Sequence, residues 1–236
     1  MISIILPTYN ERGCILDLVE SIGSAMVGYE YELIVIDDNS PDGTSDLIRA
    51  RFDGVENRTL VTRLANHGLV NSINEGLSRS NGSICVWMDA DMSMSPRLIP
   101  VMLEKIEDGA DLVVGSRYIP GGAVKGSDPT EEFSWSKVGV ALNRSEDSLL
   151  SAVISKWGNK VIKRILSSQL NDFSSGYFVA KKEILKTPAL IGGIVDYCIR
   201  FTAEVEQSGC QVVEVPMVLI PRKTGNSKTS SSIGSI

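Results

Sequence analysis

The first half of the chain alternates short apolar runs with stretches in which hydrophobic residues recur every three or four positions. The runs predict buried strands, and the longer period predicts one face of an amphipathic helix. In residues 10–22, for example, Ile15, Leu18, Val19 and Ile22 recur at helical spacing. The pattern predicts strands at 2–7, 31–38, 58–64, 83–91 and 110–118, with a helix between each strand and the next.

Such alternation is typical of an α/β fold, with a mostly parallel central sheet flanked by helices on both faces. Ligands of these sheets bind beyond the carboxyl ends of the strands. Polar clusters begin where four of the predicted strands stop, namely PTYNE, DDNSPDG, DADMS and SRY. We therefore expect these four clusters to meet at one edge of the sheet.

The second half is less regular. It predicts a Gly/Pro/Ser-rich loop at 118–137, helices near 146–168 and 196–208, a strand at 211–221 and a basic C-terminal segment. With 236 residues in all, the chain suits a single domain.

The composition narrows the classes of function. The net charge of −6 argues against a nucleic-acid-binding protein. Cys14, Cys85, Cys198 and Cys210 show no CxxC spacing, which indicates reduced thiols in a cytoplasmic protein. We see neither a signal peptide nor an apolar run that could span a bilayer, so we expect no membrane crossing by this chain.

Asp89 and Asp91 are the strongest candidates for chemistry. They follow an apolar run in VWMDADMS, and residues i and i+2 of an extended strand point the same way. A carboxylate pair of this kind suits Mg²⁺ or Mn²⁺ together with phosphate oxygens. A solvated turn is the alternative, and the four converging clusters favour the metal site.

Other charged residues follow the strands as well. Asp38 could accept hydrogen bonds from a base or ribose, although a helix cap and turn explain its neighbour Asp42. Arg117 could hold a diphosphate, with a surface ion pair as the alternative. Arg222 and Lys228 lie in a basic Gly/Ser-containing segment that could close over phosphates or remain a solvated tail. His67 is the only histidine, and no Ser-His-Asp or Cys-His set can be assembled around it.

Six motifs occur in a familiar order: SIILPTYNE, LIVIDDNSPDGT, MDADMS, LVVGSRYIPGG, DFSSGYFVAKKEIL and EVPMVLIPRKTGNSK. Together they resemble the polyprenyl-phosphate glycosyltransferases of glycosyltransferase family 2, in particular those similar to dolichyl-phosphate mannose synthases. The resemblance covers nearly the whole chain. It implies a GT-A fold with a Rossmann-like nucleotide-sugar- and metal-binding half at 1–120 and an acceptor-side half of the same domain at 121–236.

The resemblance also implies roles for individual residues. Asp89 and Asp91 would bind Mg²⁺ or Mn²⁺, and Asp91, Arg117 and Asp172 would be catalytic, Asp172 orienting acceptor or sugar unless it only caps a turn. The nucleotide sugar would contact Pro7, Tyr9, Glu11, Ile36, Asp38, Asp89, Ala90, Asp91, Arg117, Arg222 and Lys228. The chain departs from the family pattern at Ser93, where the family usually has glutamine or a similar polar group, and at Ser151, where an arginine is expected. Lys156, Lys160 or Arg144 are candidates to replace that arginine.

We expect inverting transfer of a hexose, preferably mannose from GDP-mannose, to a polyprenyl phosphate. The alternatives are glucose from UDP-glucose, another family 2 transfer, or a non-catalytic nucleotide-sugar-binding subunit. A sugar-phosphate nucleotidylyltransferase would need a Gly-rich basic loop that PTYNERG does not provide.

A lipid acceptor requires contact with a membrane surface, on its cytosolic side in this case. In VISKWGNKVIKRIL, Ile154, Trp157, Val161 and Ile165 form an apolar helix face among Lys156, Lys160, Lys163 and Arg164. The alternative is a helix packed on the sheet. We therefore expect a peripheral protein, a truncated one, or one that docks on a membrane-anchoring subunit.

Overall fold

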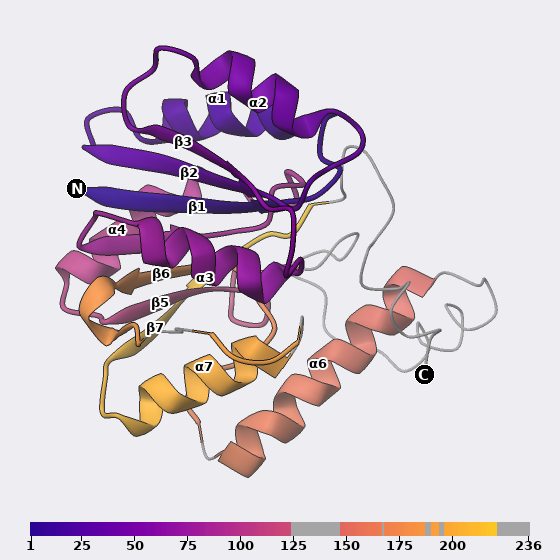
Figure 1. Ribbon diagram of the computed structural model, residues 1–236. Helices are drawn as coiled ribbons and strands as arrows, with labels where there is room; N and C mark the ends of the chain where they lie inside the picture. Colours follow the sequence, from indigo (N-terminus) through magenta and orange to yellow (C-terminus); the bar gives the residue numbers. More distant parts are fainter. Residues whose placement is uncertain (124–146, 167, 187–189, 194–195, 221–236) are drawn as a thin grey trace.

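A seven-stranded sheet in the order β3-β2-β1-β4-β6-β5-β7 forms the centre of the molecule (Figure 1). The computed structural model describes residues 1–123, 147–166, 168–186, 190–193 and 196–220, without the side chains of 147–156. The strands are β1 (Ile2–Thr8), β2 (Tyr31–Asp37), β3 (Arg58–Thr62), β4 (Ile84–Trp87), β5 (Leu112–Ser116), β6 (Phe178–Lys181) and β7 (Val212–Pro216).

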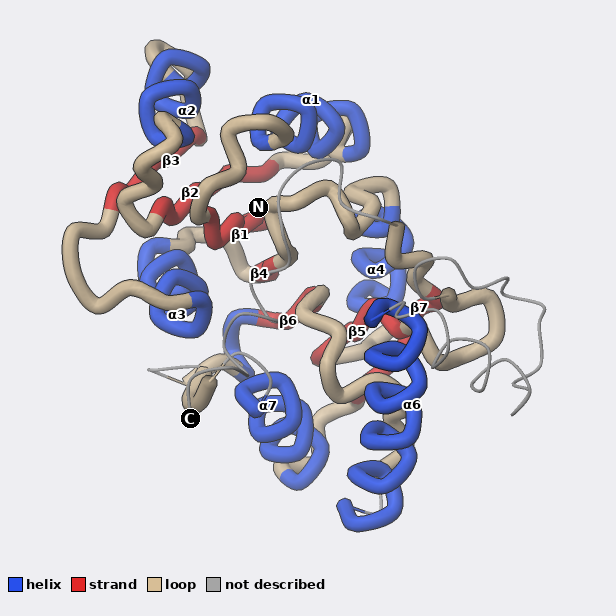
Figure 2. The backbone as a smooth tube through the Cα atoms, turned by 90° about the vertical axis from the view of Figure 1, so that its right-hand side faces the viewer, coloured by secondary structure: helices blue, strands red, loops and turns tan. Residues whose placement is uncertain are grey.

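The helices are α1 (Ile15–Ala25), α2 (Thr44–Phe52), α3 (Leu69–Arg79), α4 (Leu98–Glu107), α6 (Asp147–Leu166) and α7 (Asp196–Gln207), with a short 3₁₀ turn, η1, at Lys182–Ile184. Helices α1, α2 and α4 cover one face of the sheet, and α3, α6 and α7 lie on the other (Figure 2). This arrangement confirms the predicted α/β class.

Each strand supplies alternate side chains to two separate cores. In β1, Ile4 and Leu6 pack with α1 and α4, whereas Ile5 packs with α3 on the opposite face. Helix α3 approaches β1 closely because residue 76 is glycine: a Cβ atom there would lie 2.3 Å from Cγ2 of Ile5. The close approach fixes the position of α3 and of the loop that precedes it.

Most of the sheet is parallel, as predicted, but β6 is not. It runs antiparallel to β4 on one side and to β5 on the other. The remaining pairs, β1–β2, β1–β4, β2–β3 and β5–β7, are parallel. Since β4 and β5 are both antiparallel to β6, they run in the same direction. The carboxyl ends of β1, β2, β4 and β5 therefore meet at one edge, as expected.

Several predicted strands are too long, those for β4 and β7 most of all. Strand β4 ends at Trp87 rather than at residue 91, because its pairing with β1 ends at Ile5 and Trp87. Strand β7 ends at Pro216 rather than at residue 221. The basis for placing Asp89 and Asp91 on an extended strand was therefore wrong, and both lie in a turn after β4. In the described part of the chain, no helix is both long and apolar enough to cross a membrane.

Candidate active site

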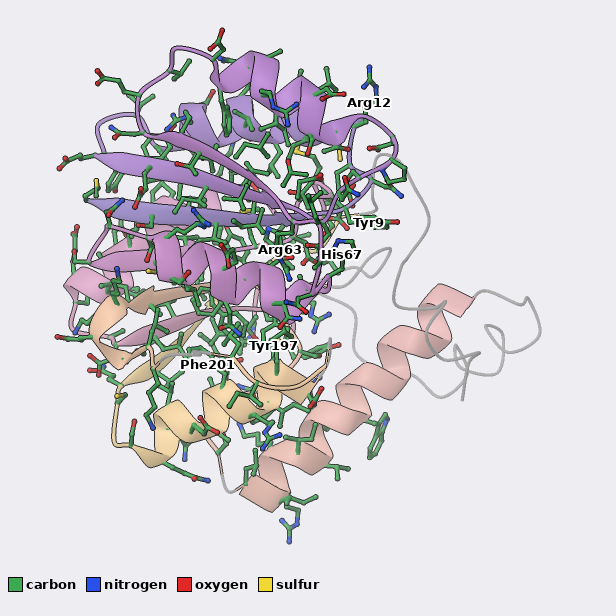
Figure 3. All side chains as sticks on the ribbon, viewed as in Figure 1. Tyr9, Arg12, Arg63, His67, Tyr197 and Phe201 are labelled. Carbon is green, nitrogen blue, oxygen red and sulfur yellow. The ribbon has the colours of Figure 1, made fainter. Side chains whose placement is uncertain are left out.

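The loop after β1 carries Tyr9 and Glu11 to this edge of the sheet. Pro7 is tolerated in β1 because β4 no longer pairs there, so its missing N–H is not needed for that ladder. Tyr9 is 43% exposed at the edge (Figure 3), whereas Glu11 is buried. Three amides of this loop donate to side chains of the loop after β2: Asn10 N to Ser40 Oγ (2.8 Å), Glu11 N to Thr44 Oγ1 (3.1 Å) and Arg12 N to Asp42 Oδ2 (3.1 Å).

The loop after β2 begins with two buried carboxylates. Asp37 accepts hydrogen bonds from Ser40 N (2.9 Å) and Ser45 Oγ (2.6 Å), so it stabilises the turn into α2. Asp38 forms an ion pair with Arg63, at 3.1 Å between Oδ1 and Nη1. The predicted nucleotide contact Ile36 is fully buried in β2, where its side chain packs in the core that α3 covers.

The two aspartates in the turn after β4 differ in burial. Asp91 is 2% exposed and its Oδ1 accepts the Ser93 amide at 2.9 Å, while Asp89 is only partly buried. Met92 completes the turn in a left-handed conformation with φ of 63°. Ala90 between them is buried, and its carbonyl accepts a weak hydrogen bond from the thiol of Cys14 at 3.5 Å. The thiol thus ties this turn to the start of α1.

These carboxylates can bind a divalent metal only if a bound phosphate group supplies further oxygen ligands. Among the described residues, no group of three or more His, Cys, Asp or Glu side chains is placed to hold a metal ion. Two carboxylates supply hard oxygen atoms, and an octahedral Mg²⁺ or Mn²⁺ takes its other ligands from phosphates and water. The donor set therefore suits a metal that binds together with a diphosphate.

Arg117 follows β5 and forms a buried bidentate ion pair with Asp172. Its Nε donates to Oδ2 at 2.8 Å and its Nη2 to Oδ1 at 2.7 Å. Nη2 also donates to the carbonyl of Ser174 at 2.9 Å. Within the part of the chain that the structure describes, Nη1 has no partner, which leaves two donors for a ligand. Burial alone would lower the pKa of Arg117, but the hydrogen bonds and charge of Asp172 outweigh it and raise that pKa. The guanidinium is permanently charged.

A second set of contacts holds Asp172 in place. Glu214 of β7 accepts hydrogen bonds from the amides of Asn171 and Asp172, both at 3.0 Å. On α6, Asn159 accepts the Phe173 amide at 2.6 Å, and its amide group donates to Ser174 Oγ at 3.3 Å. The segment 171–174 is thereby fixed between the sheet and α6.

The C-terminal segment leaves the described structure beside the turn that carries Asp89 and Asp91. After β7, the Met217 amide donates to the Ser116 carbonyl at 2.8 Å and the Ile220 amide to the Ser93 carbonyl at 3.0 Å. Ser93 lies two residues after Asp91. Arg222 and Lys228 are outside the described residues, and the chain enters their segment next to this turn.

The structure thus brings Tyr9, Asp38, Asp89, Asp91 and Arg117 to one edge. Sequence reasoning missed the residues that position them, chiefly Arg63, Asn159 and Glu214. Arg63 follows strand β3 directly. Arg117 was selected as a charged residue at the carboxyl end of a strand, and the same criterion could have found Arg63. Asn159 and Glu214 give no such signal, because their role depends on how the second half folds back on the sheet.

A comparison with protein families decides the assignment. The model for "Glycosyl transferase family 2" matches residues 3–187. The chain belongs to glycosyltransferase family 2. This family 2 chain is 30% identical to a "Dolichol-phosphate mannosyltransferase" of Pyrococcus furiosus, over 96% of the chain and 58% of the relative. It is 32% identical to a "Polyprenol monophosphomannose synthase" of Mycolicibacterium smegmatis, over 97% of the chain and 81% of the relative.

Solved structures share the fold of this family 2 chain. Glucosyl-3-phosphoglycerate synthase from Mycobacterium tuberculosis, in complex with Mn²⁺, UDP and phosphoglyceric acid, aligns with a TM-score of 0.63 and 21% identity, over 100% of this chain and 74% of that one. The mannosyltransferase PcManGT from Pyrobaculum calidifontis, in complex with GDP-Man and Mn²⁺, aligns with a TM-score of 0.63 and 17% identity, over 98% of this chain and 59% of that one. The predicted GT-A fold is confirmed.

Proposed function

We propose that this chain is an inverting hexosyltransferase that transfers mannose from GDP-mannose to a polyprenyl phosphate such as dolichyl phosphate. The names of its two curated relatives support this choice of sugar and acceptor, although the chain spans only 58% of the length of the Pyrococcus one. The observation that carries the proposal is the joint presence of the Asp89–Asp91 turn and the charged Arg117 at one edge of the sheet.

The residues at this edge can stabilise a diphosphate as it leaves the sugar. A Mg²⁺ or Mn²⁺ held by Asp89 and Asp91 would neutralise charge on the leaving group. Arg117, whose Nη1 has no partner among the described residues, would donate to the diphosphate oxygens as negative charge develops there. Asp172 fixes the orientation of that guanidinium and is itself too buried to touch a substrate. The acceptor phosphate is already anionic at neutral pH, so this reaction needs no protein base.

The donor site would use the residues that the family resemblance implies. Tyr9 offers an exposed ring at the edge, and Asp38 offers an acceptor oxygen to the base. The full set of proposed donor contacts is Pro7, Tyr9, Glu11, Ile36, Asp38, Asp89, Ala90, Asp91, Arg117, Arg222 and Lys228. The position of the Ile220 amide against Ser93 supports closure by Arg222 and Lys228, since their segment begins there.

A donor panel tests this function. Purified protein is incubated with Mn²⁺, a short polyprenyl phosphate and either GDP-mannose or UDP-glucose, and lipid-linked sugar is measured. We expect transfer from GDP-mannose that stops with a chelator and falls at least a hundredfold in Asp91→Asn. If sugar is transferred only from UDP-glucose, the donor is UDP-glucose and not GDP-mannose. Metal-dependent binding without transfer would instead support the non-catalytic subunit.

Helix α6 supports a place at a membrane surface. Trp157, Val161 and Ile165 lie at i, i+4 and i+8 and are 46%, 53% and 74% exposed. Lys160 and Arg164 are exposed among them, with the Lys160 ammonium 5.5 Å from the Trp157 ring centre. We propose that this face, called the α6 face below, docks on the cytosolic leaflet of the membrane that holds the acceptor. All four cysteines are free, which supports a reducing compartment.

A further inference from the structure

Nitrogen Nη2 of Arg117 faces three acceptor atoms, although it carries only two N–H groups. It lies 2.7 Å from Oδ1 of Asp172, 2.9 Å from the Ser174 carbonyl and 2.8 Å from the Ser174 hydroxyl. Nε donates its single N–H to Oδ2 of Asp172 at 2.8 Å. Among the described residues, every hydrogen-bond partner of this guanidinium therefore lies on its Nε–Nη2 side, and the two N–H groups of Nη1 remain for a ligand.

An arginine can pair with a carboxylate through two hydrogen bonds in two ways. In the side-on arrangement, which the structure shows for Arg117 and Asp172, Nε and Nη2 bind the two oxygen atoms. In the end-on arrangement Nη1 and Nη2 bind them, and only the single N–H of Nε remains for a ligand. Because both arrangements give the carboxylate two hydrogen bonds and the same counter-charge, the charge of Asp172 does not decide between them.

The position of Ser174 favours the side-on arrangement. Its carbonyl and its hydroxyl both lie within hydrogen-bond distance of Nη2, so both N–H groups of that nitrogen are used. To pair end-on, the guanidinium of Arg117 would have to shift along the carboxylate, which moves Nη2 away from the two Ser174 oxygen atoms. Acceptors next to a buried charge would then lose their donor, and this loss is unfavourable.

The hydroxyl of Ser174 is itself held by Asn159 of α6, which is 4% exposed. Oδ1 of Asn159 accepts the Phe173 amide at 2.6 Å, and because that amide can only donate, Nδ2 faces Ser174 and donates to its Oγ at 3.3 Å. A hydroxyl oxygen has two acceptor positions. Arg117 and Asn159 fill both, which leaves the hydroxyl proton for Oδ1 of Asp172 at 3.5 Å.

We propose that the Ser174 hydroxyl, held by Asn159, selects the side-on pairing of Arg117 and thereby leaves both N–H groups of Nη1 to the departing diphosphate. Ser174 and Asn159 are positioning residues, since they act through Arg117. The inference rests on the proposed function, in which Arg117 stabilises the charge that develops on the diphosphate. Because the second donor matters most as that charge develops, losing the side-on pairing should lower kcat and change KM for the donor little.

Ser174→Ala removes the hydroxyl and is the direct test. With GDP-mannose, Mn²⁺ and a short polyprenyl phosphate, we expect kcat to fall at least tenfold and KM for the donor to change by less than about threefold. Ser174→Thr keeps the hydroxyl and should recover most of the lost rate. An unchanged kcat in Ser174→Ala, or equal losses in the alanine and threonine variants, would overturn the inference.

Binding without turnover gives a second measurement, which a general loosening of the site would not change in the same way. GDP carries the charge that the reaction creates on the diphosphate, whereas GDP-mannose does not yet carry it. In calorimetric titrations with Mg²⁺, we expect Ser174→Ala to lose at least fivefold in affinity for GDP and less than about twofold for GDP-mannose. Equal losses for the two ligands would overturn the inference. Ser174→Cys, whose sulfur is a weak acceptor, replaces an alanine variant that does not fold.

Asn159→Leu tests how α6 supports the hydroxyl. Its affinity for GDP should fall relative to that for GDP-mannose, as in Ser174→Ala. The double variant should lose less than the product of the two single losses, because both substitutions act on one hydroxyl. A double variant that loses the full product would overturn the assignment of Asn159. If the leucine variant does not fold, Asn159→Ser takes its place.

The matched control is Asn81→Leu. It removes a hydrogen bond from Nδ2 of Asn81 to Oε2 of Glu32, 3.0 Å long, at the opposite edge of the sheet. It should leave kcat and the relative affinities for GDP and GDP-mannose unchanged. A change in that ratio as large as in Ser174→Ala would overturn the inference, since any lost side-chain bond would then produce it.

Failure of the proposed function gives a different result. If UDP-glucose and UDP bind to the wild-type chain with Mg²⁺ and the guanosine compounds do not, the same comparison is made with that pair and the same outcomes decide it. If none of the four compounds binds, the proposed function fails, and the inference about Ser174 fails with it.

If donor and diphosphate bind as expected but the Ser174 and Asn159 variants behave like wild type, only the inference is overturned.

Discussion

Arg117 and Asp172 form the most buried ion pair that the structure describes, with side chains 12% and 0% exposed. Asp172→Asn keeps the shape of the side chain and leaves the guanidinium without its counter-charge. Because breaking a buried pair strands the remaining charge, we expect a loss of about 3–5 kcal/mol in the free energy of unfolding. Urea unfolding followed by circular dichroism measures it.

The matched control is Asp46→Asn, which breaks the exposed Asp46–Arg49 pair on α2. Exposed pairs contribute about 0–1 kcal/mol, so this variant should unfold nearly like wild type. Equal losses in the two variants would show that Asp172 does not stabilise the fold through Arg117.

The four thiols should differ in reactivity. Burial raises the pKa of Cys198 to about 12 and also raises the pKa of Cys85. The thiolate is the reactive form, so at pH 8 these two groups are protonated as well as covered. We expect Ellman's reagent to modify the half-buried Cys210 first and the others only on unfolding. Cys210→Ser removes the fast reaction; a fast phase that persists in this variant would contradict the assignment.

At the scale of elements, α6 has two different sides. Asn159 and Lys163 attach it to the loop that holds Asp172, with Lys163 Nζ 2.9 Å from Asn171 Oδ1. Ile162 and Leu166 pack against the core under α7. The α6 face is turned away from these contacts. Contact between that face and a membrane would therefore act close to the residues that position Arg117.

Replacing Trp157, Val161 and Ile165 together by serine tests the α6 face. Burial of such side chains stabilises by about 1.5–3 kcal/mol each, so we expect at least a tenfold weaker association with vesicles of phosphatidylcholine and phosphatidylglycerol. Sedimentation of the vesicles measures bound protein. Lys160 and Arg164 favour anionic lipid, so wild-type binding should weaken with added salt.

Val27→Ser is the matched control, because Val27 is 79% exposed in the turn after α1 and far from α6 in the sequence. It should bind vesicles like wild type. If the triple variant also binds like wild type, the α6 face does not contact lipid. If neither the wild type nor the triple variant binds vesicles, the proposed contact of the α6 face with these lipids is contradicted.

The same elements show what sequence patterns could and could not predict. The five first-half strands and their common edge were predictable because each strand contains a short apolar segment and is followed by an amphipathic helix or a polar cluster. β6 was missed, since its four residues lie in the DFSSGYFVAKKEIL segment and pair antiparallel with strands far away in the chain. The end of β4 was misjudged because Met88 and Ala90 are apolar and buried without being in a strand. Burial in this turn arises from packing that periodicity does not reveal.

At the scale of the whole molecule, donor and metal should stabilise the fold together. A ligand present at a hundred times its dissociation constant contributes about 2.7 kcal/mol, which raises Tm by roughly 5–10 °C in a chain of this size. We expect this shift with GDP-mannose and Mn²⁺ in differential scanning fluorimetry. Asp91→Asn or a chelator should remove most of it. A full shift in the presence of chelator would contradict a metal-dependent donor site.

The central position of β6 in the sheet affects how the chain folds during its synthesis. A ribosome completes β4 and β5 well before it synthesises residues 178–181, which must then insert between them. Until that point, the growing polypeptide exposes two hydrophobic strand edges that can pair with other chains. Translation products that terminate before residue 178 should therefore aggregate, and newly made chains should depend on chaperones until β6 emerges.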